Sequence, residues 1–206
     1  MCIRDSYTTL KSTIADYLNR SDLTSIIPTF ISLAEANFQR NVKHWKMHKR
    51  AEAILDTEFT AVPSDYLEAI RWHITTAPPS VIEYASPIEI MNAKTANNDN
   101  AGRPTLFAVV NQQFQVHPRP NQNYNSELLY YSKIPVLSDS NASNWLLDDH
   151  PDLYLYASLQ ASAPYLMQDE RITLWNELYL SATQNLIASS ETARSSGSLR
   201  MRVTTY

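Results

Sequence analysis

Glycine is nearly absent from this chain, which contains only Gly102 and Gly197 in 206 residues. Loops that bind nucleotide phosphates need several glycines, because their backbone amides must approach the anion closely. Both glycines lie in polar stretches typical of a loop or a tail. The sequence therefore argues against a P-loop or a dinucleotide-binding fold. It also lacks the glycines that a serine nucleophile elbow requires.

Apolar residues recur at helical spacing near both ends of the chain. A first helix is expected from Tyr7 to about Asn19, and residues 20–22 supply cap residues for a second. The stripe of that second helix consists of Ile27, Ile31, Ala34, Phe38, Val42 and Trp45. Two more helices are expected near the C-terminus, the first bent at Pro164 because proline lacks an N–H. The face of the last helix consists of Ile172, Trp175, Tyr179, Ala182 and Leu186.

The middle of the chain has patterns typical of strands. After Lys49, apolar and β-branched runs are interrupted by a turn signature at residues 63–65. Residues 105–118 predict a hairpin with an Asn111-Gln112 turn, and residues 126–134 predict a further strand. We therefore expect a small, mostly antiparallel β module of about five strands.

This order predicts an α+β fold, in which the N- and C-terminal helices pack as a helical body with the small antiparallel β module inserted between them. A single domain is expected over residues 7–194, with helices at 7–47, the β module at 49–135 and helices at 149–194. Residues 195–206 are expected to be a flexible tail.

Residues 1–6, "MCIRDS", are expected to be non-native or disordered. They have neither a signal-peptide core nor helical periodicity, and they coincide with a translated transposase adapter used in sequencing libraries. They also hold the single cysteine, Cys2, so the sequence predicts no disulfide.

The most site-like feature is "DDHPD" at residues 148–152. Clustered acids and a histidine can bind a metal, but further ligands would be expected nearby, and no partner motif is present. Proline is favoured at the first helical position, and acids there complement the helix dipole. We interpret Asp149, Pro151 and Asp152 as a helix start, with Asp149 as its cap.

A basic run spans residues 40–50 and contains no acid; its cations are Arg40, Lys43, Lys46, Lys49 and Arg50. A solvated helix end is the default interpretation, and a patch facing DNA or an acidic partner is the alternative. His44 and His48 have the spacing of two zinc ligands on a helix, but the protease glutamate is missing. The formal net charge of −4 gives no global attraction to nucleic acid.

No catalytic constellation is predicted. The paired carboxylates Asp169 and Glu170 lie in a charged turn, and nothing in the sequence places them in a cleft. We expect no enzymatic activity, no metal and no cofactor. No apolar run approaches the length of a membrane span.

The tail at residues 195–206 alternates in polarity. Leu199, Met201 and Val203 are interleaved with polar residues that include Arg200, Arg202 and Tyr206. This period of two suits a strand, yet no partner strand is evident in the same chain. Strand addition to another subunit would complete it, and a frayed terminus is the alternative.

Several stretches in this order resemble the adaptor, or head-to-tail connector, proteins of short-tailed bacteriophages. They are "VPSDYLEAIRW", "FAVVNQQFQVHPRP" with "ELLYYSKIPVLSD", and "NWLLDDHPDLYLYASLQASAPYLMQDERITLWNELYLSA". The resemblance covers about residues 7–193. Its signature is a pattern of elements and contains no catalytic motif.

This resemblance implies a structural virion protein, assembled in the host cytoplasm. Its copies would form a ring, typically dodecameric, that joins the portal protein to the tail nozzle protein. The tail residues Leu199, Arg200, Met201, Arg202, Val203 and Tyr206 would contact the portal, and the basic run would meet DNA in the channel or an acidic portal surface. No membrane contact is implied. A non-catalytic carbohydrate- or partner-binding module on a helical scaffold is the alternative.

Overall fold

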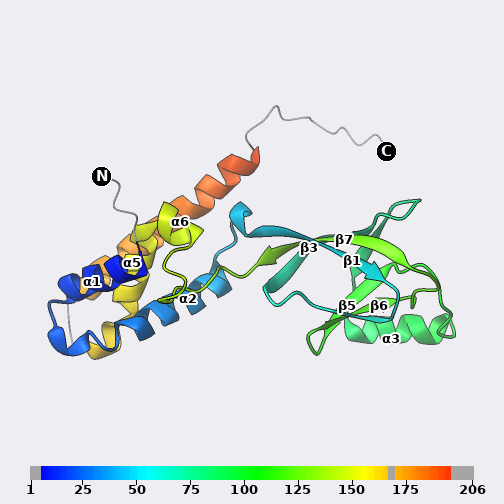
Figure 1. Cartoon of the computed structure of the whole chain (residues 1–206), viewed down its shortest axis with the longest axis horizontal. Helices are drawn as coiled ribbons and strands as arrows, with labels where there is room; N and C mark the ends of the chain where they lie inside the picture. Colours follow the sequence, from blue (N-terminus) through cyan, green and yellow to red (C-terminus); the bar gives the residue numbers. More distant parts are fainter. Residues whose placement is uncertain (1–5, 167–169, 196–206) are drawn as a thin grey trace. The chain divides into compact units, whose positions relative to one another are not determined.

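The computed structural model describes residues 6–166 and 170–195, which divide into two compact units (Figure 1). The helical unit is formed from Met1–Lys46 and Ile134–Tyr206, and the strand unit is Met47–Lys133. The described residues contain six α-helices and seven strands, so the chain has mixed helix and strand content. None of the helices in these ranges has the length and apolarity needed to cross a bilayer.

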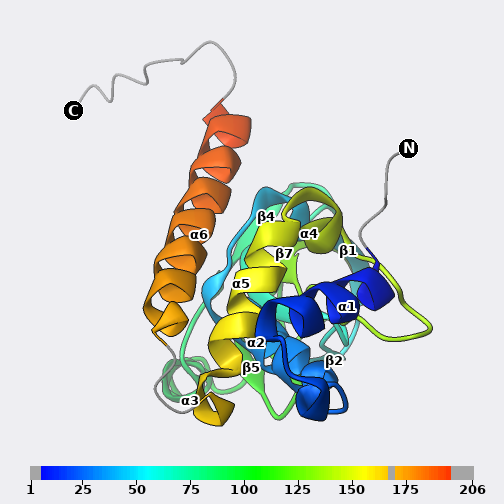
Figure 2. The ribbon, with the colours of Figure 1, turned by 90° about the vertical axis from the view of Figure 1, so that its left-hand side faces the viewer.

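The helical unit is organised around one central helix, α5. Its helices are α1 (Tyr7–Leu18), α2 (Ile27–Asn41), α4 (Trp145–Asp149), α5 (Pro151–Ala161) and α6 (Arg171–Ser195). Because α5 contacts the other four, its side chains are buried around much of its circumference; Figure 2 shows it between α6 and α1. The shared core includes Leu10, Ile14, Phe30, Ile31, Phe38, Tyr154, Leu159, Trp175 and Leu186.

The first helix is capped at both ends by local chemistry. Ser6 is its N-cap and accepts a hydrogen bond from the Thr9 N–H at 3.2 Å. Asn19 closes the helix in the left-handed conformation, which asparagine tolerates well. Ser6 is therefore ordered as a helix cap; that residues 1–6 are non-native stays a prediction, and residues 1–5 lie outside the described part.

Two expectations for the second helix are wrong. Residues 20–22 do not cap it, because a short 3₁₀ segment at Ser21–Leu23 intervenes and the N-cap is Ile26, without a side-chain hydrogen bond. The helix also ends at Asn41, so Trp45 does not continue its apolar stripe and is 41% exposed. The earlier stripe residues Ile27, Ile31, Ala34 and Phe38 are buried on α2 as predicted.

The expected bend at Pro164 is also wrong. The helix that was to contain it ends at Ala161, and Pro164 lies in a separate 3₁₀ segment, Ala163–Tyr165. A proline in the helix interior would have lost the hydrogen bond to the Gln160 carbonyl, so the chain ends the helix instead of bending it.

A buried network of hydrogen bonds holds residues 134–144 against the helices. One carboxylate oxygen of Glu35, on α2, accepts from the Leu137 N–H at 2.7 Å and from the Tyr154 hydroxyl at 3.2 Å. The side-chain amide of Asn144 donates to the Pro135 carbonyl at 2.7 Å and to the Tyr154 hydroxyl at 2.8 Å. The polar atoms named here therefore all have hydrogen-bond partners.

The same segment is held at its two ends by further hydrogen bonds. Gln39 donates to the Ile134 carbonyl at 2.7 Å and accepts from the Ile134 N–H at 3.1 Å. At the other end Asn144 caps α4, accepting from the N–H groups of Leu146 and Leu147 at 3.1 and 2.9 Å. One buried asparagine thus serves both the network and a helix start.

The network predicts a pH dependence of stability. Burial raises the pKa of Glu35 above its usual value, against the opposing effects of its hydrogen bonds with Leu137 and Tyr154. Because the folded state then holds a proton that the unfolded state releases, stability falls as pH rises from the unfolded pKa through the raised one. Glu35→Gln carries no charge, so its stability relative to the wild type should increase between about pH 4 and pH 7.

Denaturant unfolding at several pH values measures this difference. Glu177→Gln, on the exposed face of α6, is the matched control and should change stability little at any pH. A Glu35→Gln variant whose relative stability is constant, or falls, over that pH range would contradict the assignment.

The strand unit is one sheet in the order β1-β7-β3-β4-β5-β6-β2. Its strands are β1 (His48–Leu55), β2 (Phe59–Ala61), β3 (Tyr66–Ile74), β4 (Ser80–Tyr84), β5 (Leu106–Val110), β6 (Gln113–His117) and β7 (Tyr124–Ser132). All neighbours are antiparallel except β4 and β5, which are parallel and are connected through α3 (Pro87–Ala96). The expected content was about five strands, so two were missed.

Local chemistry explains several elements of the sheet. Asn111 and Gln112 both have positive φ (48° and 60°), as a tight hairpin turn between β5 and β6 requires. Ser86 and Glu89 form a reciprocal capping box at the start of α3. The sheet core consists of Leu55, Trp72, Ile74, Ile82, Phe107, Phe114, Val116, Tyr124, Leu128 and Tyr130.

Candidate functional site

The acidic cluster lies where α4 ends and α5 begins. Asp149 is the last residue of α4, so the capping role predicted for it is wrong. α5 begins at Pro151 with Asp152 in its first turn, and its N-cap, His150, makes no side-chain cap hydrogen bond. The Asp149 carboxylate instead accepts from Lys46 in a surface ion pair.

Two histidines and a tryptophan lie near this junction. The buried His44 ring stacks on Trp145, with ring centroids 5.0 Å apart, and meets the His150 ring edge-on at 6.5 Å. His44 Nδ1 accepts from the Lys46 N–H at 3.2 Å, so this nitrogen is occupied. His48 begins β1 in the strand unit, so His44 and His48 do not lie on one helix and the spacing noted in the sequence carries no zinc site. No group of three or more potential ligands that could hold a metal occurs within residues 6–166 and 170–195.

Asp149→Ala is therefore expected to change the free energy of unfolding by less than about 1 kcal/mol, as exposed ion pairs generally do. Thermal unfolding is the measurement, and Asp139→Ala, which removes the surface pair with Lys11, is the matched control. A loss of about 2 kcal/mol would be the size of a lost helix cap and would contradict the placement of Asp149. A chelator should leave the wild-type melting temperature unchanged.

The basic run is divided between the two units. Arg40 lies in the last turn of α2 and Lys43 follows that helix, whereas Lys49 and Arg50 lie on β1. Lys46, Lys49 and Arg50 each have a carboxylate partner: Asp149, Asp65 and Glu127. The run is thus not one helix face, and most of its charge is locally compensated. Contact with DNA or an acidic partner stays a prediction for these residues.

The predicted tail contacts, Leu199, Arg200, Met201, Arg202, Val203 and Tyr206, lie outside the described residues. Asp169, of the carboxylate pair, is also outside them, and Glu170 is exposed just before α6.

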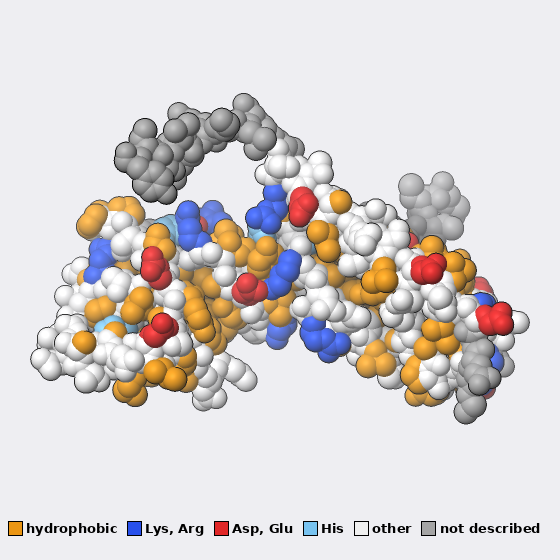
Figure 3. Space-filling model, turned by 180° about the vertical axis from the view of Figure 1, so that it is seen from behind, with side chains coloured by type: hydrophobic (Ala, Val, Ile, Leu, Met, Phe, Trp, Pro, Cys, Tyr) orange, Lys and Arg blue, Asp and Glu red, His pale blue; other side chains and the backbone are white. Residues whose placement is uncertain are grey.

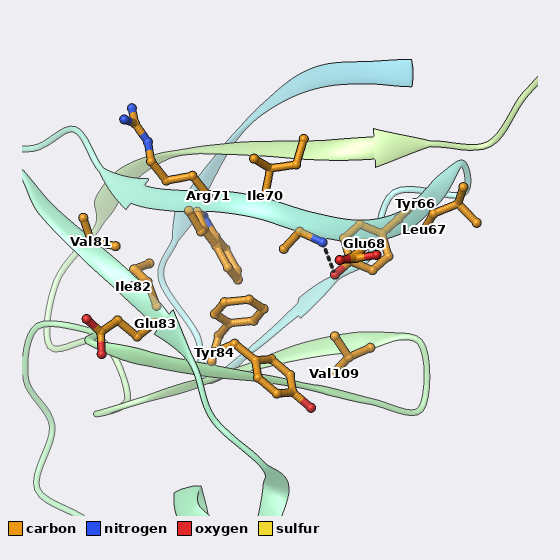
Figure 4. A pocket seen from close by; sticks show the side chains of 13 residues that line it. Tyr66, Leu67, Glu68, Ile70, Arg71, Val81, Ile82, Glu83, Tyr84 and Val109 are labelled. Atoms are coloured by element: carbon orange, nitrogen blue, oxygen red, sulfur yellow. Dashed lines mark hydrogen bonds between the residues drawn. The ribbon is translucent and has the colours of Figure 1, made fainter. Parts of the chain in front are cut away.

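The strand unit contains a cleft that the sequence did not indicate (Figure 4). It has a volume of about 680 Å³ and lies between β3 and the strands β4 and β5. Trp72 and Phe107 are buried lining residues, with ring centroids 5.2 Å apart. Ile70, Val81 and Tyr84 are exposed lining residues, with exposed fractions of 40%, 55% and 67%. Figure 3 shows that hydrophobic side chains also gather on the surface of the strand unit.

The ionisable groups that line this cleft are Glu68, Arg71 and Glu83, with the tyrosines Tyr66 and Tyr84. Burial raises the pKa of Tyr66 above its usual value, and the Tyr66 hydroxyl accepts a hydrogen bond from the Ala69 N–H at 2.9 Å. The cleft is chemically suited to binding an apolar chain segment, because its lining is mostly apolar, with Ile70, Val81 and Tyr84 exposed.

A family model described as SU10 adaptor protein matches residues 5–202. No curated protein matches the chain.

Proposed function

Because the chain belongs to the SU10 adaptor protein family, we propose that its copies form a ring that joins a phage portal to the tail. The observation that carries this proposal is the extent of the match, which covers both units. The family makes the chain a phage structural adaptor and a virion component. We also propose that the ring is a dodecamer and that it contacts DNA in its channel.

Exposed apolar side chains support the ring. On the helical unit they include Leu33, Leu174, Leu180 and Ile187, and on the strand unit they include Val81, Tyr84, Ile88 and Met91. Ring closure multiplies many weak lateral contacts, so no single interface has to be large.

A partner-binding module is the second candidate, and the cleft between β3 and β4 is the observation that favours it. The two functions differ in assembly. Light scattering of the purified chain, alone and mixed with its portal protein, measures the mass of the complex. The adaptor function predicts a multi-copy assembly on the portal, whereas a chain that stays monomeric with portal present would favour the binding module.

A further inference from the structure

The cleft is bordered by strand edges that no described strand pairs. β3 pairs with β4 only at Trp72–Ile74, opposite Ser80–Ile82, and beyond that point the two strands diverge. Residues 66–71 of β3 therefore have β7 on one side and the cleft on the other (Figure 4). An unpaired strand edge can accept an extended segment through main-chain hydrogen bonds.

One main-chain donor on this part of β3 bonds a side chain where a neighbouring strand would offer a carbonyl. The Ala69 N–H donates to the Tyr66 hydroxyl at 2.9 Å. A strand added at this edge would bring main-chain carbonyl oxygens, which are acceptors of the kind such a donor pairs with in a sheet.

The polarity and charge of the cleft also favour one kind of occupant. Its lining is mostly apolar, and its charged residues are two carboxylates, Glu68 and Glu83, against one guanidinium, Arg71. Both carboxylates are exposed. The cleft therefore favours an extended segment with alternating apolar and cationic side chains.

We propose that the occupant is residues 199–205 of a second copy of this chain, added as a strand between β3 and β4. In an extended strand Leu199, Met201 and Val203 share one face, and Arg200 and Arg202 share the other. The apolar face would cover the exposed apolar side chains of the cleft, Ile70, Val81 and Tyr84, while the arginines face the exposed carboxylates. Residues 196–206 contain two arginines and no acid, which matches the net charge of the cleft.

The proposal that the added strand comes from a second copy rests on the proposed ring. A tail that binds a cleft is a contact between two different surfaces, which is the type of contact that closes rings. The assignment of the segment to the cleft does not depend on the ring, and it differs from portal attachment, which the sequence alone suggested.

A labelled peptide of residues 196–206 tests the assignment to the cleft. Fluorescence anisotropy would follow its binding to the full chain carrying Arg200→Gln and Arg202→Gln, so that the chain's own tail is uncharged and neither form of the cleft attracts it. Adding Glu68→Lys and Glu83→Lys should weaken binding by about tenfold, because two attractions become repulsions. Asp56→Lys, an exposed acid of the same unit outside the cleft, should not.

A peptide with both arginines changed to glutamate should prefer the protein with the reversed cleft, which excludes simple misfolding as the cause. No binding of the natural peptide, or equal binding to all three proteins, would overturn the proposal. If portal attachment requires the tail but the peptide does not bind the cleft, the tail is assigned to the portal instead.

Mixing two full-length variants tests whether the contact is made between copies. One variant carries the reversed cleft and a natural tail, and the other carries a natural cleft and the reversed tail. Each alone should assemble poorly, and the mixture should recover assembly, because every tail then finds a matching cleft on another copy. If assembly recovers only when one chain carries both the reversed cleft and the reversed tail, donation by a second copy is overturned. Normal rings from every variant would overturn the whole inference and leave the proposed function standing.

Discussion

Replacing Trp175 with alanine should lower the free energy of unfolding by about 3 to 5 kcal/mol, the usual loss when a large buried ring is removed from a core. Trp175 is 4% exposed on α6, and the Arg171 guanidinium lies 5.1 Å from its ring centroid. Its neighbour on the same buried face of the helix is Tyr179, four positions on. Urea denaturation followed by circular dichroism measures the loss.

Leu174→Ala is the control for Trp175→Ala, since Leu174 is the adjacent residue and 53% exposed. It should change stability by less than about 1 kcal/mol. A Trp175→Ala variant with unchanged stability that no longer assembles would place the ring of Trp175 between subunits, contrary to its burial within one copy.

Asn144→Ala should cost about 3 kcal/mol, because it removes a helix cap, a buried hydrogen bond to Tyr154 and a partly buried one to Pro135. The lost bonds leave the Pro135 carbonyl and the Tyr154 hydroxyl each with one partner fewer. Asn144→Ser retains an oxygen that can cap α4 but loses the amide donor, so its loss should be smaller than that of the alanine variant.

Asn141→Ala is the matched control for Asn144→Ala. Asn141 also donates to a main-chain carbonyl, that of Val136 at 2.7 Å, but this bond is exposed. Equal losses at Asn141 and Asn144 would show that burial of the network adds nothing, which would contradict its assigned role.

Sequence periodicity predicted buried faces and turns correctly where the pattern lies within one helix or one hairpin. Ile172, Trp175, Tyr179, Ala182 and Leu186 were predicted to share a face. The last four are buried on α6 together with Ser190, whereas Ile172 is only partly buried. The hairpin turn at Asn111-Gln112 was also predicted, because the two residues separate alternating apolar runs. In both cases the signal spans a single element.

Helix ends were predicted less well, because proline and acidic residues fit several positions near a helix start. Asp149 has the right chemistry for a cap, but Asn144 starts a short helix five residues earlier, and Asp149 ends it. The signal that could have found this is an asparagine directly before the apolar "WLL" of residues 145–147. The role of Asn144 in the network, in contrast, depends on Glu35 and Tyr154, which are distant in sequence.

The cleft could not be predicted from the sequence. It exists because β3 pairs with β7 along its length but with β4 over only three residues. The choice of partner strand is a long-range property, and register irregularities at Leu67 and Ile70 further alter which residues face the core. The apolar residues Ile70, Val81 and Tyr84 are individually unremarkable in strands, so no local pattern marks them as cleft residues.

Electron microscopy of the full chain mixed with its purified portal protein tests whether the copies form a ring on the portal. We expect a closed ring of copies, coaxial with the portal and bound at one of its ends, with the opposite face of the ring free to receive a tail component. Portal particles without added density, or with single copies bound at scattered positions, would contradict it.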